Sequence, residues 1–81
     1  MSVRLRASVA ADLARHGLEP LLGDTLASLR ERLNDRYLED VRSLKARQRA
    51  GEIPLGEYAR HVQALKEQYP SLGLPLPRWE A

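Results

Sequence analysis

Residues 24–50 have the sequence DTLASLRERLNDRYLEDVRSLKARQRA, which contains neither glycine nor proline. Apolar side chains recur along this stretch in steps of three or four residues, at Leu26, Leu29, Leu33, Tyr37, Val41 and Leu44. This spacing places them on one face of an α-helix, and Asp24 is suited to cap the first turn. The stretch therefore predicts a long amphipathic helix, and we refer to its apolar face as the apolar seam.

A turn follows this helix and starts a second one. Gly51 interrupts the helical pattern, and Pro54 is suited to the first turn of a helix, where no backbone N–H donor is needed. Apolar residues then recur at helical spacing, at Tyr58, Val62, Leu65 and Tyr69. Because the link is short, residues 24–50 and 54–69 are expected to pack as an antiparallel helical hairpin.

The hairpin resembles a known family. The motif lies within residues 41–69 and consists of Gly51-Glu52-Ile53, a helix start, Glu57-Tyr58 and, after a further one to two turns, Leu65. This arrangement is similar to SHOCT, a short helical hairpin with the pattern G-x-I, a hydroxyl residue, acidic residues, an aromatic and spaced leucines. Pro54 and Gly56 depart from that pattern, which usually has a hydroxyl cap and an acidic residue there. The resemblance implies an oligomerisation or interaction module without catalysis.

The N-terminal segment fits two interpretations. Three apolar residues lie four positions apart, at Leu5, Val9 and Leu13. They predict a short helix over residues 2–16 that ends at Gly17. Residues 2–9 also alternate between polar and apolar side chains, which is typical of a strand. A lone strand would have no partner within a helical chain, so it would pair with a second copy.

The strand interpretation resembles the ribbon-helix-helix fold, in which the two-stranded ribbon of a dimer lies in the major groove of DNA. That resemblance implies that Arg4 and Arg6 face the bases, while Val3 and Leu5 lie in the core. The alternative function is therefore that of a dimeric DNA-binding regulator.

Helix lengths indicate that the apolar seam needs further cover. The helix over residues 24–50 is about 40 Å long, whereas its partner over residues 54–69 reaches about 24 Å. Leucines in the first half of the seam are left outside the hairpin, although burying each one stabilises the fold by about 1.5–3 kcal/mol. The N-terminal helix, about 20 Å long, or a second copy could cover them. We expect a homodimeric four-helix bundle, because a single core in a chain this small would be lean.

The partner interface is expected on the seam and in the tail. On the seam it comprises Leu26, Leu29, Leu33 and Tyr37. Residues 70–81 form a proline-rich tail that the prolines keep extended. Its apolar side chains either cover the open end of the hairpin or offer Trp79 to another protein, since tryptophan is enriched at binding hot spots.

Catalysis and metal binding are not expected. Cysteine is absent, which excludes thiolate ligands. His61 lies one helical turn after Glu57, but no third ligand is spaced to join them. The adjacent carboxylates Glu39 and Asp40 diverge by about 100° around a helix. No nucleophile, phosphate-loop or dinucleotide motif occurs, so we expect a non-catalytic protein without a cofactor.

Charge and hydropathy suggest no membrane partner. The net charge of +2 is too small to indicate nucleic acid or a membrane by itself. Four cations crowd the end of the long helix, where the helix dipole favours them: Arg42, Lys45, Arg47 and Arg49. No apolar run approaches the about 18 residues of a membrane span. Asp12 and Arg15 interrupt the apolar stretch near the N-terminus, so we expect no signal peptide and a cytoplasmic protein.

Together these patterns predict an all-α fold in a single small domain over residues 1–81. Val, Ile and Thr contribute only six residues, which disfavours a β-fold. The expected function is homo-oligomerisation or interaction with an unidentified protein, in an accessory or scaffold role.

Overall fold

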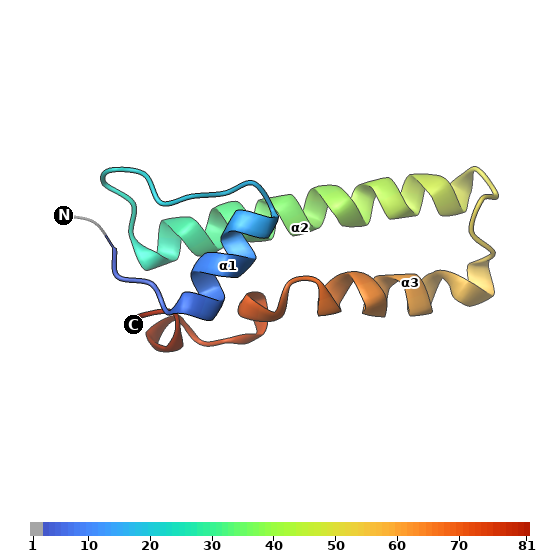
Figure 1. Cartoon of the computed structure of the whole chain (residues 1–81). Coiled ribbons are helices and arrows are strands. Elements are labelled where there is room, and N and C mark those ends of the chain that lie inside the picture. Colours follow the sequence, from blue (N-terminus) through green and yellow to red (C-terminus); the bar gives the residue numbers. More distant parts are fainter. Residues whose placement is uncertain (1–2) are drawn as a thin grey trace.

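Three α-helices make up most of the computed structural model, which describes residues 3–81 (Figure 1). They are α1 (Ala7–Arg15), α2 (Leu26–Arg49) and α3 (Leu55–Glu67), and two short 3-10 turns follow, η1 (Pro70–Gly73) and η2 (Leu76–Arg78). The predicted all-α fold is confirmed. The described part of the chain measures 47 × 19 × 17 Å, and α2 runs along its length.

Helix α2 begins one residue later than Asp24 would place it, because Thr25 is the N-cap. The Thr25 hydroxyl accepts a hydrogen bond from the Ser28 N–H at 3.0 Å, and the Ser28 hydroxyl accepts one from the Thr25 N–H at 2.8 Å. This capping box satisfies two backbone donors that the helix itself leaves free. Asp24 instead accepts a hydrogen bond from the Leu21 N–H at 2.8 Å and so holds the preceding loop.

Helices α1 and α2 both end in a Schellman motif with glycine in the left-handed conformation. Gly17 has a φ of 72° and Gly51 a φ of 83°. The Gly17 N–H bonds to Ala14 and the Leu18 N–H to Leu13, and the same pattern repeats around Gly51. Glycine adopts positive φ without the steric cost of a side chain, so these two positions end their helices as the sequence predicted.

The hairpin of α2 and α3 is thin at its closed end. The two helices run antiparallel in Figure 1, and at about 36 Å and 20 Å their lengths differ as expected. Ile53 closes the turn with 2% of its surface exposed, whereas Leu55 is 75% exposed and does not. Leu44 is buried on α2, but no residue of α3 is fully buried. The closed end therefore consists of two helices without a third layer.

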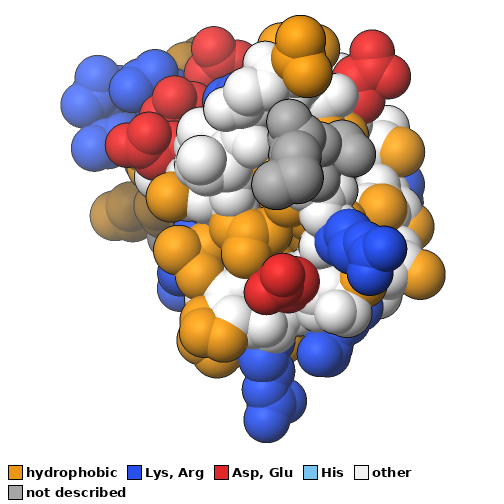
Figure 2. Space-filling model, turned by 90° about the vertical axis from the view of Figure 1, so that its left-hand side faces the viewer, with side chains coloured by type: hydrophobic (Ala, Val, Ile, Leu, Met, Phe, Trp, Pro, Cys, Tyr) orange, Lys and Arg blue, Asp and Glu red, His pale blue; other side chains and the backbone are white. Residues whose placement is uncertain are grey.

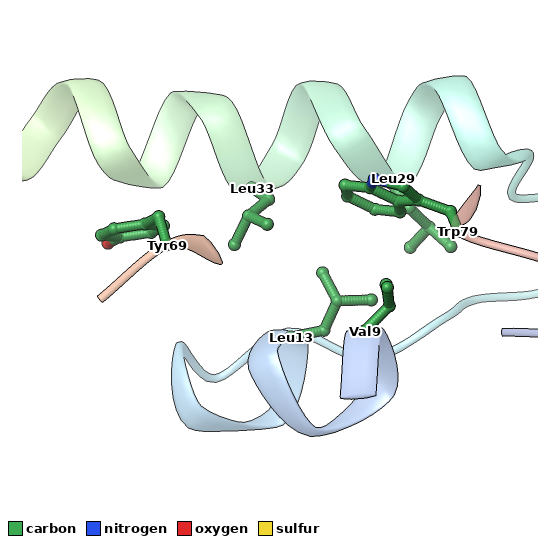
Figure 3. Close-up of a cluster of buried hydrophobic side chains, with 6 residues drawn as sticks. All are labelled: Val9, Leu13, Leu29, Leu33, Tyr69 and Trp79. Carbon is green, nitrogen blue, oxygen red and sulfur yellow. The ribbon is translucent and has the colours of Figure 1, made fainter. Parts of the chain in front are cut away.

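The main core lies at the opposite end, where α1 and the tail pack on the first half of α2. Its six buried side chains are Val9, Leu13, Leu29, Leu33, Tyr69 and Trp79. Figure 3 shows the side chains of α1 and Trp79 pointing toward the leucines of α2. The first half of the seam is thus covered by the same chain, which removes the reason for expecting a dimer through these leucines.

The N-terminal segment is extended before it becomes helical. Helix α1 begins at Ala7 rather than at residue 2, and Leu5 forms an antiparallel bridge with Glu80. The Arg6 N–H donates to the Trp79 carbonyl at 2.8 Å, and the Ala81 N–H donates to the Arg4 carbonyl at 3.2 Å. The expectation that a strand here could pair only with a second copy was wrong, because the chain's own C-terminal segment supplies the partner.

The tail is folded rather than extended. Pro70 and Pro77 fall in the first turns of η1 and η2, and Pro75 is the N-cap of η2, so their missing N–H groups cost no hydrogen bond. Ser71 and Trp79 are buried, and Leu72, Leu74 and Leu76 are half-buried against the core. The tail therefore covers the open end of the hairpin, which was one of its two predicted roles.

The polar residues of α2 make this helix unsuited to cross a membrane. At 24 residues α2 is long, but its sequence is strongly polar outside the seam. Within residues 3–81, none of the helices is both long and apolar enough to cross a membrane.

Candidate functional site

The residues predicted to form a partner interface lie mostly inside the molecule. Leu29, Leu33 and Trp79 have 0% of their surface exposed. Leu26 and Tyr37 are half-buried at the edge of the same core. The prediction was wrong for the three buried residues, because α1 and the tail already occupy the face on which a partner would pack.

A buried polar contact holds the tail on α1. Ser71 is 1% exposed and donates a side-chain hydrogen bond to Asp12, which is 4% exposed. Asp12 also pairs with Arg15 on the same helix. The Trp79 indole N–H donates to the Ser71 carbonyl at 3.0 Å. Every buried side-chain nitrogen and oxygen within residues 3–81 has a hydrogen-bond partner, so this contact needs no ligand.

An aromatic stack joins the three helical elements beside the core. The His16 ring lies parallel to the Tyr69 ring at 3.8 Å between centroids, with an interplanar angle of 9°. Tyr37 meets the same ring edge-on at 5.3 Å. His16 Nε2 lies 2.8 Å from the Gln68 carbonyl, so the imidazole is held on both its face and its edge. These contacts give His16 a structural role.

The phenol of Tyr69 is held in its protonated form. Burial raises the pKa of Tyr69 to about 12, and the hydrogen bond that its hydroxyl donates to Asp40 adds to the shift. At neutral pH the group is therefore a donor rather than a base.

A shallow groove of about 340 Å³ runs between α2 and the junction of α3 with η1. Its lining is mainly apolar and consists of Asn34, Tyr37, Lys66, Tyr69, Pro70, Leu72 and Gly73. Tyr37 is the predicted interface residue that this groove still exposes. No metal-binding cluster of three or more His, Asp or Glu side chains occurs in residues 3–81.

Arg4 and Arg6 are the residues that the strand interpretation places against DNA. Both are exposed, whereas Val3 and Leu5 are half-buried. However, their backbone already pairs with the C-terminal segment. Figure 2 views this end of the molecule, where side chains of both charges are interspersed among hydrophobic ones.

The outer face of α2 carries an ordered pattern of charge. Six exposed residues form what we call the outer stripe: Glu31, Asp35, Leu38, Arg42, Lys45 and Arg49. At 3.6 residues per turn they fall within about 80° of arc, on the side of α2 opposite to Leu29 and Leu33. Acidic residues lie before Leu38 and basic residues after it. Leu38 itself is 39% exposed.

The charges of the outer stripe are unpaired in the part of the chain that the structure describes. The ion pairs formed by α2 lie outside the stripe: Arg32 pairs at 2.6 Å with Asp24, which precedes the helix, and Arg36 pairs with Glu39 at 3.9 Å. None of the stripe residues has an oppositely charged side chain within 4.0 Å among residues 3–81.

The order of charge in the outer stripe is present in the sequence, but the helix dipole explains only its basic half. The helix dipole accounts for the cations at 42, 45 and 49, which lie toward the C-terminal end of α2. That explanation says nothing about the acidic residues at 31 and 35 on the same face. The stripe residues recur in steps of three or four, as the seam residues do, so helical periodicity applied to the charged residues predicts the stripe.

Comparison with protein-family models, with curated proteins and with solved structures found no match for this chain. Kinship with SHOCT stays a prediction that rests on the hairpin motif.

Proposed function

We propose that this chain is a small non-catalytic protein that associates with other protein chains in an accessory or scaffold role. The outer stripe of α2 is the surface through which it binds. This proposal moves the interaction from the apolar seam, which the chain covers itself, to the opposite face of the same helix.

The engagement of two buried groups with acid–base chemistry, Asp12 and Tyr69, supports a non-catalytic role. Asp12 is occupied by Ser71 and Arg15, and the hydroxyl of Tyr69 by Asp40. A general acid or base must reach its substrate with a free lone pair or proton. These groups are instead committed to the contacts that hold the elements together.

The charge order of the outer stripe carries the proposal. Glu31 and Asp35 are four residues apart, as are Lys45 and Arg49, and both pairs have like charges. Like charges at this spacing destabilise a helix by about 0.2–0.5 kcal/mol per pair. A helix exposed only to water would be more stable with opposite charges at neighbouring positions, as Arg36 and Glu39 are on another face of α2. A bound partner of complementary charge would offset the cost.

Chemical cross-linking of the full chain in cell extract, read by mass spectrometry, tests the proposal. The variant E31Q/D35N/R42Q/K45Q removes two acids and two bases, so the net charge is unchanged. We expect the wild type to be cross-linked to a protein chain, either its own kind or another, and the variant to lose that adduct.

A matched control changes the same number of charges on α3. The variant E57Q/R60Q/K66Q/E67Q also leaves the net charge unchanged, and all four side chains are exposed. It should keep the adduct. Equal cross-linking of the two variants, or no adduct for the wild type, would refute a role for the outer stripe.

A further inference from the structure

We infer that the occupant of the outer stripe is a second copy of this chain, packed antiparallel so that the two Leu38 side chains meet. This inference rests on the proposed function and specifies its partner. It follows from the positions of the charges relative to Leu38.

Four of the five charges of the stripe are complementary to themselves under a twofold rotation, and only Arg49 has no acidic counterpart, because Ala27 lies opposite it. Glu31 precedes Leu38 by seven residues and Lys45 follows it by seven. Asp35 precedes it by three and Arg42 follows it by four. In an antiparallel pair centred on Leu38, the residue opposite each acid is therefore a base of the partner. The axial offset between partners is zero for the first pair and about 1.5 Å for the second.

The angular positions fit the same arrangement. Around the helix, Asp35 and Arg42 lie on the same side of Leu38, at about 60° and 40°. Glu31 and Lys45 lie about 20° from it on opposite sides, close to the central line. Under a twofold axis perpendicular to both helices, residues on one side of Leu38 in one copy face residues on the same side of Leu38 in the other. Asp35 thus meets the partner's Arg42 on one side of the apolar centre, and Glu31 meets the partner's Lys45 close to the central line.

The arrangement explains why the partner is a copy rather than a polyanion or a uniformly charged protein. A nucleic acid would be attracted by Arg42, Lys45 and Arg49 but repelled by the acidic half of the stripe. A twofold interface presents the same surface from both sides, so it needs both signs on one stripe. The outer stripe meets that requirement, because its acidic residues lie on one side of Leu38 along the helix and its basic residues on the other.

The dimer is expected to be weak and sensitive to salt. Leu38 supplies the apolar centre from a side chain that is 39% exposed. The remaining contacts are exposed ion pairs, whose attraction is screened by salt. We therefore expect the fraction of dimer to fall as salt rises from about 50 mM to about 500 mM.

Charge reversal followed by mixing is the first test. The variant E31K/D35K makes the stripe basic and the variant R42E/K45E makes most of it acidic. Each alone should dissociate at least about tenfold more readily than the wild type in sedimentation equilibrium. An equimolar mixture should recover the dimer, because each basic position then faces an acidic one. Circular dichroism checks that both variants keep the helical content of the wild type.

Single cysteines test the register, and the absence of native cysteine makes the result unambiguous. Under mild oxidation L38C should form a disulfide-linked dimer, whereas Q63C on the exposed surface of α3 should not. E31C mixed with K45C should cross-link, while E31C alone should not. A parallel dimer would give the reverse result for the last two.

The outcomes separate this inference from the proposed function. If the reversed variants do not recover association on mixing, or L38C does not cross-link, the antiparallel dimer is refuted. The proposed function survives that result if the wild type still forms a stripe-dependent adduct with a different protein. If no adduct and no dimer depend on the stripe, both are refuted.

Discussion

Ser71 donates a hydrogen bond to the buried carboxylate of Asp12 across 59 residues of sequence. The contact fastens the C-terminal tail to the first helix and lies under Trp79, whose indole bonds to the Ser71 carbonyl. Like the bridge of Leu5 and Glu80, it links the two ends of the chain. Ser71 and Asp12 are both buried, so the contact lies within the folded interior.

Removal of the Ser71 hydroxyl should destabilise the fold. In Ser71→Ala the Asp12 carboxylate stays buried with one donor fewer, which costs about 1–3 kcal/mol. Urea unfolding followed by circular dichroism measures the loss. Ser43→Ala is the control, because Ser43 is exposed on α2 and alanine favours a helix at such a site. Equal stability of the two variants would show that the buried contact contributes nothing.

Truncation of Trp79 should have a larger effect. Its side chain is completely buried against the leucines of α2, and Trp79→Ala should cost about 3–5 kcal/mol. Thermal unfolding checks this, with the exposed Arg78→Ala as control. Trp79 is the single tryptophan of the chain, so its fluorescence reports on the tail directly. Emission typical of a water-exposed indole in the native wild type would contradict the folded tail.

Stability should fall at high pH because of Tyr69. Its folded pKa is about 12, against 10.0 for an ordinary tyrosine. The unfolded chain therefore releases this proton first, and the contribution of Tyr69 is present below about pH 10 and is lost as the pH rises toward 12. In Tyr69→Phe that part of the pH dependence should disappear, whereas Tyr58→Phe should retain it. Urea midpoints at about pH 9 and pH 11 measure the difference.

Asp24 should contribute to stability at neutral pH but not in acid. The Leu21 N–H, then the Ser28 hydroxyl and Arg32, hold the pKa of Asp24 below its ordinary value of 3.8. A depressed folded pKa gives stability that is present above 3.8 and is lost as the pH falls through the folded value. Asp24→Asn should therefore melt below the wild type at neutral pH. The two melting temperatures should converge in acid, and a constant gap would disprove the assignment.

Local structure was largely predictable from the sequence. Helix α2 could be predicted because its signals are local in the sequence: apolar residues at helical spacing, and no glycine or proline. The same holds for the turns at Gly17 and Gly51, where positive φ favours one residue type. The choice of N-cap was wrong by one residue, because Asp24 and Thr25 are both good caps and Ser28 completes the box only with Thr25.

The cover of the apolar seam could not be predicted in the same way. The N-terminal helix and a second copy both had suitable length, and periodicity does not distinguish them. What favours the chain's own segments are contacts between positions far apart, Asp12 with Ser71 and Leu5 with Glu80. Neither contact has a local signal in the sequence. The alternating pattern at the N-terminus did indicate an extended segment, but not the identity of its partner.

Because the closed end of the hairpin is thin, the order in which parts of the chain fold is expected to differ from the order in which their amides are protected against exchange. The turn at Gly51 brings α2 and α3 together through contacts that are close in sequence, so this part can form early in folding. The main core must wait for residues near both ends of the chain to meet. In the native state, however, no side chain of α3 is fully buried, whereas Leu29 is. The backbone amide hydrogens of α3 should therefore exchange with solvent sooner than those around Leu29. We therefore expect the hairpin to form first in folding and also to open first in the native state.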